Sequence, residues 1–372
     1  MSPPAAGSDE VDQPVQQVAG ICRAQPPAGL GGGISGSSSR NCSAVRAQAG
    51  AKIPNQRAIS QLPHSSFSIE NRPQRRKKRQ DQALRLAPSP LRKRAVTRQA
   101  EAVGFDCGMS SDHFRPWSVA QGHSGFAWSW LGAAMAATRL PMGVISAPGY
   151  RYHPAIIAQG TATLTEMFPN RFWLALGSGQ HLNEDITGPI WPEKPERNAR
   201  LRECADVIRA LLGGEMVTHR GCVTVVEAKL FSRPVQPPPL LGAALTEATA
   251  EAVGAWADGL LTVSAAPDQM RKVLAAFWRG GGQGKRLVVQ VTLNWAPTEA
   301  EARSGAHEQW RANALGGELN WELRTPEAFD IATRFVRPED MRECVWISSD
   351  VGWHTARIAE LIEVGFDEIQ LH

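Results

Sequence analysis

The sequence predicts an α/β fold in which helices cover a parallel sheet. From residue 107 onward, short apolar segments alternate with longer amphipathic segments. The short segments are apolar at successive positions, which is typical of strands buried on both faces. This βα rhythm favours either a barrel or a doubly wound sheet. The seven expected strands are 107–110, 142–146, 172–176, 239–243, 259–264, 287–293 and 368–371.

Amphipathic helices are expected between these strands, and each returns the chain for another parallel strand. A first helix from about residue 91 stops at Gly104, since glycine commonly ends helices. Residues 154–167 and 198–212 have further helical apolar spacing. Residues 296–345 show helical stretches but no clear strand. We interpret them as an insertion before the last strand and a candidate lid.

Composition narrows the class of protein. Of the 372 residues, 42% are hydrophobic and 20% are charged, which is ordinary for a globular chain. No apolar run approaches the roughly 20 residues of a membrane span, so we expect no integral membrane protein. No secretory signal is visible, and the six cysteines show no two-residue spacing. We therefore expect a cytoplasmic protein without a disulfide framework or a structural metal.

The two parts of the chain differ in charge. Residues 1–100 hold 16 Lys and Arg against 5 Asp and Glu, whereas residues 101–372 hold 24 against 31. Residues 1–80 are rich in Ser, Gly, Pro and Arg and lack periodicity, which predicts a disordered extension. The basic run at 75–79 could contact nucleic acid. A solvated tail, an unusual targeting extension or a misread start explains it better, so a nucleic-acid partner is not expected.

The loop after the first expected strand carries the first candidate residues. Asp112, His113 and Trp117 are titratable and aromatic groups that a rigid strand would hold open to a ligand. From these residues alone, a capped turn with an ordinary loop histidine is an equally good interpretation.

Two more strand ends carry candidate residues. The turn that begins at Gly177 runs through Gln180 to Asn183 and lacks the third glycine of a dinucleotide fingerprint. The small residues at 242–244 precede a plausible helix N-cap. Such a helix start can bind a phosphate, although an ordinary capped helix looks the same in sequence.

Several blocks in the same order resemble the luciferase-like flavin oxidoreductase superfamily. The blocks are Ser111 to Trp117, Gly125 to Ala134, Arg151 to Gln159, Gly177 to Glu184, and His219-Arg220-Gly221. The chain is most similar to the deazaflavin-dependent glucose-6-phosphate dehydrogenase group and to its sister set of probable flavin oxidoreductases. The resemblance covers residues 88–372 and implies a (β/α)8 TIM barrel, in preference to the doubly wound sheet. It also implies an enzyme acting on a small molecule, and a possible homodimer.

The resemblance implies roles for individual residues. His113 would be the general base on the hydroxyl that loses hydride, and Trp117 would lie over the developing charge. Asp112 and Asn183 would contact the flavin ring. A cis peptide beneath that ring would fall at Val144-Ile145. The residues expected at the cofactor phosphate are Gly242, Ala243 and Ala244.

Departures from the group's pattern affect the cofactor and the substrate. Gln180 stands where the dehydrogenases have a proton-donating Glu, and a carboxamide cannot titrate. Val263 and Ala266 replace the Thr and Lys that hold a sugar phosphate, so glucose-6-phosphate is not the expected substrate. The pattern around Gln180 favours FMN over an F420-type deazaflavin. His181 could replace the missing acid if it points inward, whereas His123 and His153 are expected to be polar loop or cap residues.

Two gaps in the pattern predict an altered barrel. Residues 80–90 contain no buried strand where the first barrel strand is expected. The chain also ends at His372, where a loop and a closing helix are expected. An opened barrel exposes strand edges, which keeps open the alternative of a truncated family member without activity.

Overall fold

The computed structural model describes residues 19–23 and 90–372, and within them eight strands form a closed barrel. Going around the barrel, the order is β1, β12, β9, β8, β7, β4, β3 and β2. All neighbouring pairs are parallel except those of β1. The predicted TIM barrel is thereby confirmed and the doubly wound sheet is excluded.

The seven strands expected from apolar runs are all present, with ends within two residues of their predicted positions. Unbroken apolar segments locate such strands well because each is buried by helices outside and side chains inside. The strands are β2 (Gly108–Ser111), β3 (Met142–Ser146), β4 (Phe172–Leu176), β7 (Leu240–Ala243), β8 (Gly259–Val263), β9 (Arg286–Val291) and β12 (Glu368–Leu371).

The first strand is altered, as the sequence indicated, but the barrel is not open. β1 (Ala19–Arg23) lies between β2 and β12 and runs antiparallel to both. It comes from the segment predicted to be disordered, and the structure differs from that prediction at these five residues. The rest of the predicted extension, including the basic run at 75–79, lies outside the described residues.

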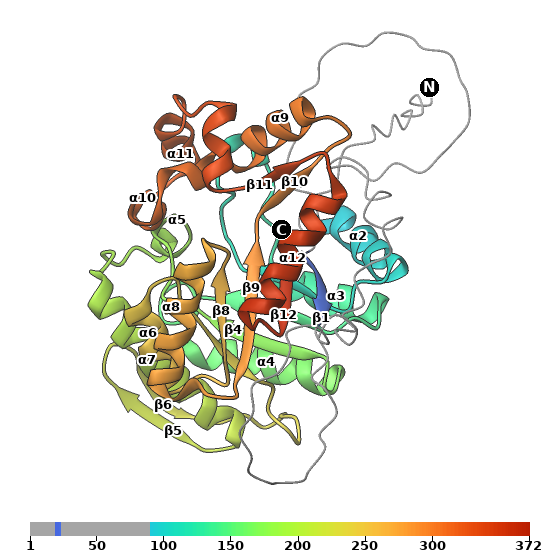
Figure 1. Cartoon of the computed structure of the whole chain (residues 1–372). Helices are drawn as coiled ribbons and strands as arrows, with labels where there is room; N and C mark the ends of the chain where they lie inside the picture. The colour runs from blue at the N-terminus through green and yellow to red at the C-terminus, as the bar shows by residue number, and fades with distance from the viewer. Residues whose placement is uncertain (1–18, 24–89) are drawn as a thin grey trace, which may run out of the picture.

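Helices surround the barrel, as Figure 1 shows. An outer core packs these helices on the strands, and a smaller inner core fills the barrel around Trp173, Leu241 and Val288. Within the described residues, no helix is both long and apolar enough to cross a membrane. The surrounding helices are α2 (Pro90–Val103), α3 (Ala127–Ala137), α4 (Pro154–Met167), α6 (Lys194–Gly213), α7 (Glu247–Gly254), α8 (Pro267–Phe277) and α12 (Val351–Val364).

The insertion lies over one end of the barrel, where β9 continues into β10 (Figure 1). The parallel strands β10 (Leu293–Trp295) and β11 (Trp346–Ser348) flank it. Between them no strand forms, as predicted, and the segment is helical. Its helices are α9 (Glu299–Trp310), α10 (Gly317–Glu322) and α11 (Pro326–Ala332).

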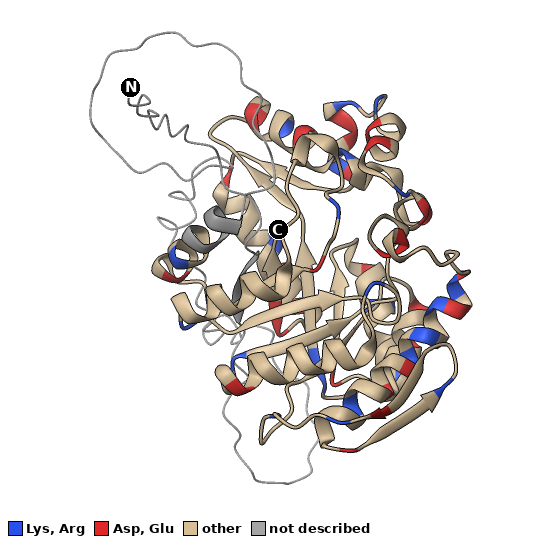
Figure 2. Cartoon of the chain, turned by 180° about the vertical axis from the view of Figure 1, so that it is seen from behind, with Lys and Arg blue, Asp and Glu red and all other residues tan. Residues whose placement is uncertain are grey.

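Charged residues lie on the helices and on an outer hairpin, while the barrel strands are mostly uncharged (Figure 2). The hairpin consists of β5 (Val217–Arg220) and β6 (Thr224–Ala228), and it follows α6.

Candidate active site

The floor of the candidate site is formed by small and apolar residues at the carboxyl ends of three strands. Gly177 follows β4, and a Cβ built on it would lie 3.7 Å from Ala243 Cβ and 3.9 Å from Ile145 Cδ1. All three residues are partly exposed. None of these residues carries a charge, so they form an apolar floor at the carboxyl ends of the strands.

His113 projects from the loop directly after β2 and is partly exposed. Its imidazole packs edge-on against the Trp117 indole, with ring centroids 5.5 Å apart. Trp117 in turn packs edge-on against Phe329 of α11, at 5.1 Å. The predicted base and the predicted aromatic partner are therefore adjacent, and the insertion supports them.

Asn183 connects the His113 loop to Gln180. Its Oδ1 accepts hydrogen bonds from the backbone N–H groups of Phe114 and Arg115, at 2.9 and 3.1 Å. Its Nδ2 donates to Gln180 Oε1 at 3.0 Å. Asn183 is buried, and both ends of its amide bind protein groups. It therefore orders the loop, and its predicted contact with the cofactor ring stays a prediction.

Asp112 differs from its expected role, because its carboxylate has no exposed surface and cannot reach a ligand. Trp128 Nε1 and Ser146 Oγ donate to its Oδ2, at 3.1 and 2.8 Å. The Tyr152 hydroxyl and the Arg151 guanidinium donate to its Oδ1, at 3.4 and 3.5 Å. Asp112 thus joins three elements beneath the site.

Arg151 lies between two buried carboxylates. Its guanidinium is 3.5 Å from Asp112 and 3.6 Å from Glu184, whose side chain is 2% exposed. Burial raises the pKa of the Glu184 carboxyl to about 7, although Arg151 opposes the shift. Burial also raises the pKa of Tyr152, with Asp112 adding to the rise. The network can therefore hold a proton at neutral pH.

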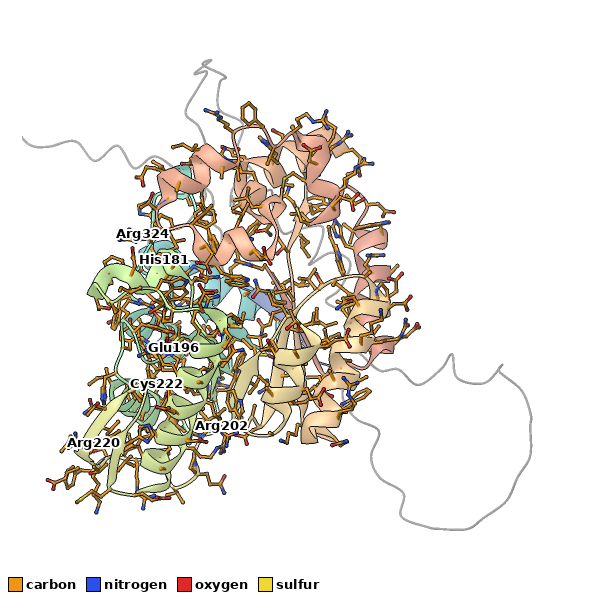
Figure 3. All side chains as sticks on the ribbon, turned by 90° about the vertical axis from the view of Figure 1, so that its left-hand side faces the viewer. His181, Glu196, Arg202, Arg220, Cys222 and Arg324 are labelled. Atoms are coloured by element: carbon orange, nitrogen blue, oxygen red, sulfur yellow. The ribbon has the colours of Figure 1, made fainter. Side chains whose placement is uncertain are left out.

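A carboxylate fastens the insertion to the site. Asp185 is paired with Arg115 at 2.7 Å and with Arg324 of the insertion at 3.1 Å. Arg115 also donates to the carbonyl of Arg324 at 2.9 Å. His181 Nδ1 lies 3.1 Å from the Glu322 carbonyl, and Figure 3 shows His181 beside Arg324. His181 is thus bound to the insertion, and its ring stacks on Trp191, while its predicted role as a replacement for the missing acid stays a prediction.

The residues expected at the phosphate face different ways. Ala243 belongs to the floor, whereas Gly242 and Ala244 are buried beneath α7. A Cβ on Gly242 would lie 2.3 Å from Val253, so helix packing requires this glycine. Thr246 caps α7 by accepting from the Thr249 N–H. The N-cap is confirmed, and a phosphate contact through the small residues 242–244 stays a prediction.

The expected cis peptide is not present. The described residues contain no cis peptide bond, and Val144 points into the outer core while Ile145 faces the floor. His153 is the N-cap of α4, accepting from the Ala155 N–H at 3.2 Å, as predicted. His123 is an exposed loop residue.

Sequence reasoning missed the roles of Arg151 and Glu184, although both stand in the blocks that carry the family resemblance. Both lie after the ends of expected strands, where a charged residue is ordinarily exposed, so the sequence carries no signal that they are buried and paired.

A deazaflavin or flavin ring fits the chemistry of this site. The floor is apolar, and His113, Trp117 and Gln180 stand on loops that follow strands at the same end of the barrel. In the described part of the chain, no three His, Cys, Asp or Glu side chains gather as a metal site requires.

Comparison with known proteins agrees with a site for a deazaflavin or flavin. Residues 67–368 match the family described as luciferase-like monooxygenase. An F420-dependent glucose-6-phosphate dehydrogenase of Beutenbergia cavernae is 34% identical over 302 residues, 78% of this chain and 89% of that protein. The protein of the same name from Mycobacterium tuberculosis is 30% identical over 303 residues, covering 78% and 89%.

Solved structures show the same fold. An F420-dependent secondary alcohol dehydrogenase, in complex with an F420-acetone adduct, has a TM-score of 0.71 and 28% identity, covering 76% of this chain and 88% of its own. The F420-dependent tetrahydromethanopterin reductase of Methanopyrus kandleri has a TM-score of 0.58 and 21% identity, covering 76% and 89%.

Proposed function

Because the chain belongs to the luciferase-like monooxygenase family of oxidoreductases, we propose that it is a dehydrogenase that uses an F420-type deazaflavin to oxidise a secondary alcohol. The observation that carries the proposal is the placement of His113 against Trp117 at the end of the barrel where the apolar floor lies. The relatives at 30–34% identity and the solved structure at 28% are all named as F420-dependent. They support the deazaflavin and give no support to the earlier preference for FMN.

The site residues divide the work of removing hydride and proton from an alcohol. When bound, a deazaflavin accepts the hydride of the carbinol carbon. His113 takes the hydroxyl proton on an imidazole nitrogen as the C=O double bond forms. Trp117 supports the imidazole from one side and excludes water. Gln180 accepts from Asn183 through its oxygen, which leaves its N–H groups as donors that cannot transfer a proton.

The substrate class follows from the positions expected to hold a sugar phosphate. Val263 ends β8 with 44% of its surface exposed, and Ala266 precedes α8 without a side-chain cap. Neither side chain can donate a hydrogen bond or neutralise an anion. We therefore infer an alcohol without a phosphate group, although the curated relatives are named for glucose-6-phosphate.

The test is to mix purified protein with deazaflavin or FMN and a panel of secondary alcohols and glucose-6-phosphate, following the fluorescence of the oxidised cofactor. We expect secondary alcohols to reduce the deazaflavin. His113→Asn should lower kcat about 10²- to 10⁴-fold while leaving cofactor affinity unchanged. His123→Asn, an exposed histidine in the same loop, is the control. Turnover with FMN alone, or with glucose-6-phosphate as the best substrate, would contradict the proposal.

A further inference from the structure

Three elements hold the backbone of His113. Arg151 Nη2 donates to the Asp112 carbonyl at 2.6 Å, and this carbonyl belongs to the peptide that enters His113. Ser124 Oγ donates to the carbonyl of His113 itself at 2.7 Å. Asn183 accepts from the next two N–H groups. Peptide groups on both sides of the His113 Cα are therefore fixed by side chains distant in sequence.

Arg151 is itself held rigidly. Its side chain is 6% exposed, and the guanidinium stacks 4.4 Å from the centre of the Tyr152 ring. Its Nη1 donates to the Tyr152 hydroxyl at 3.3 Å, and the backbone N–H donates to Glu184 at 3.4 Å. A planar guanidinium can serve a carbonyl, two carboxylates and a hydroxyl at once, which the single ammonium of Lys cannot.

These contacts rest on groups that would otherwise be costly to bury. Asp112 and Glu184 are both nearly inaccessible and both face the guanidinium. Because one guanidinium must serve two buried carboxyl groups, it has to stay in one fixed position between them. Because the guanidinium also donates a hydrogen bond to the Asp112 carbonyl, its fixed position also fixes the backbone at the start of the His113 loop.

We propose that Arg151 and Ser124 are positioning residues for His113. Arg151 binds the carbonyl of Asp112, Ser124 binds the carbonyl of His113 itself, and together they set the direction of the imidazole. This inference rests on the proposed function, because it assumes that His113 takes the proton. A base that is misplaced by a fraction of an ångström loses rate even when substrate still binds.

The chain offers a matched control for Arg151. Arg171 donates to the carbonyls of Met135, Thr138 and Leu140, at 3.0, 2.7 and 3.0 Å. It is likewise a guanidinium that holds backbone carbonyls, but these belong to the last turn of α3 and the segment that leads to β3, and not to the His113 loop. Arg171→Lys therefore measures the cost of removing such a bond where it only supports the fold.

The experiment compares Arg151→Lys, Ser124→Ala and Arg171→Lys with the wild-type protein. We expect Arg151→Lys to lower kcat about 10- to 100-fold with KM changed less than about threefold. Ser124→Ala, which removes a partly exposed hydroxyl and should fold normally, is expected to lower kcat about threefold to tenfold. In histidine-labelled protein without cofactor, both should change the NMR titration of the His113 imidazole. Arg171→Lys should lower Tm and leave kcat and that titration unchanged.

Two results overturn the inference. One is an unchanged kcat and imidazole titration in folded Arg151→Lys. The other, which applies even if Arg151→Lys does not fold, is an unchanged titration in Ser124→Ala. The proposed function fails separately: if His113→Asn keeps full activity, His113 is not the base, whatever the titrations show.

Discussion

Glu184 is a buried carboxyl whose charge state couples the candidate site to stability. Burial raises its pKa from 4.5 to about 7, so between these values the folded protein keeps a proton that the unfolded chain has released. The favourable contribution of Glu184 to the free energy of unfolding is therefore fully present below pH 4.5. It is lost as pH rises to about 7, which lowers the stability by up to about 3 kcal/mol.

Glu184→Gln should remove this loss, because the amide is neutral at every pH. We expect the stability of the variant relative to wild type to increase between pH 5 and pH 8, measured by denaturant unfolding. Glu166→Gln, on the exposed face of α4, is the control. Parallel curves for Glu184→Gln and wild type across this range would mean that Glu184 is ionised throughout.

Gly143 shows how tightly the inner core of the barrel is packed. A Cβ on this residue would lie 2.1 Å from the fully buried Trp173 ring. Gly143→Ala should therefore cost about 1–3 kcal/mol through overpacking. Gly132→Ala in α3, where the nearest atom is 3.8 Å away, should be neutral or stabilising by up to about 1 kcal/mol. Equal Tm values for the two variants would contradict this account.

The candidate catalytic residues were easier to predict from sequence than the residues that hold their loop in place. His113 and Trp117 stand together in one short loop, so their adjacency is visible in sequence. Ser124 binds from the far end of the same loop, while the bonds from Arg151 and Asn183 depend on the segments after β3 and β4 meeting that loop at one barrel end. Asp112 was assigned to the cofactor because sequence cannot show that four protein donors already surround it.

At the scale of elements, the buried carboxylate of Asp185 is one of the groups that hold the insertion on the barrel, beside the His181–Glu322 hydrogen bond and the packing of Trp117 on Phe329. The Asp185 side chain is 6% exposed and pairs with Arg115 and Arg324. Asp185→Asn should cost about 1–3 kcal/mol, because two guanidinium groups lose their counter-charge. We also expect faster hydrogen exchange at residues 311–332 and a higher KM.

The control for Asp185→Asn is Asp206→Asn. Asp206 pairs with Arg202 on the outside of α6, where both side chains are about half exposed, and Figure 3 shows Arg202 well away from His181. Removal of this exposed pair should cost less than about 1 kcal/mol. Unchanged exchange of residues 311–332 in Asp185→Asn would show that the apolar contacts of Phe329 suffice to hold the insertion.

Strands were predicted correctly where their burial requires a continuous apolar run in the sequence. Elements without such a run were missed. β10 and β11 have three residues each, too few to show a period, and they form only because the two ends of the insertion meet. α12 was not predicted, although Asp350 caps it and Gly365 ends it. β1 lies in a segment whose composition predicted disorder. Its place is defined only by pairing with β2 and β12, which would otherwise be the two edges of the sheet.

At the scale of the whole molecule, closure of the barrel depends on β1. Its residues pair with Glu368–Leu371 of β12 on one side and with Gly108–Met109 of β2 on the other. Without it, both strands would present unpaired N–H and C=O groups, a template for association with other chains. The structure therefore predicts that five residues far from the site in sequence decide the solubility of the barrel.

Two truncations distinguish the effect of losing β1 from the effect of losing the residues that precede it. Removal of residues 1–18 keeps β1 and should leave Tm and the monomer-to-aggregate ratio unchanged in light scattering. Removal of residues 1–23 also deletes β1 and should lower Tm and cause aggregation, because the edges of β2 and β12 are then open. If both truncated proteins behave alike, β1 does not close the barrel in solution. The seven parallel strands would then be stable as an open sheet, since their helices already bury the outer face.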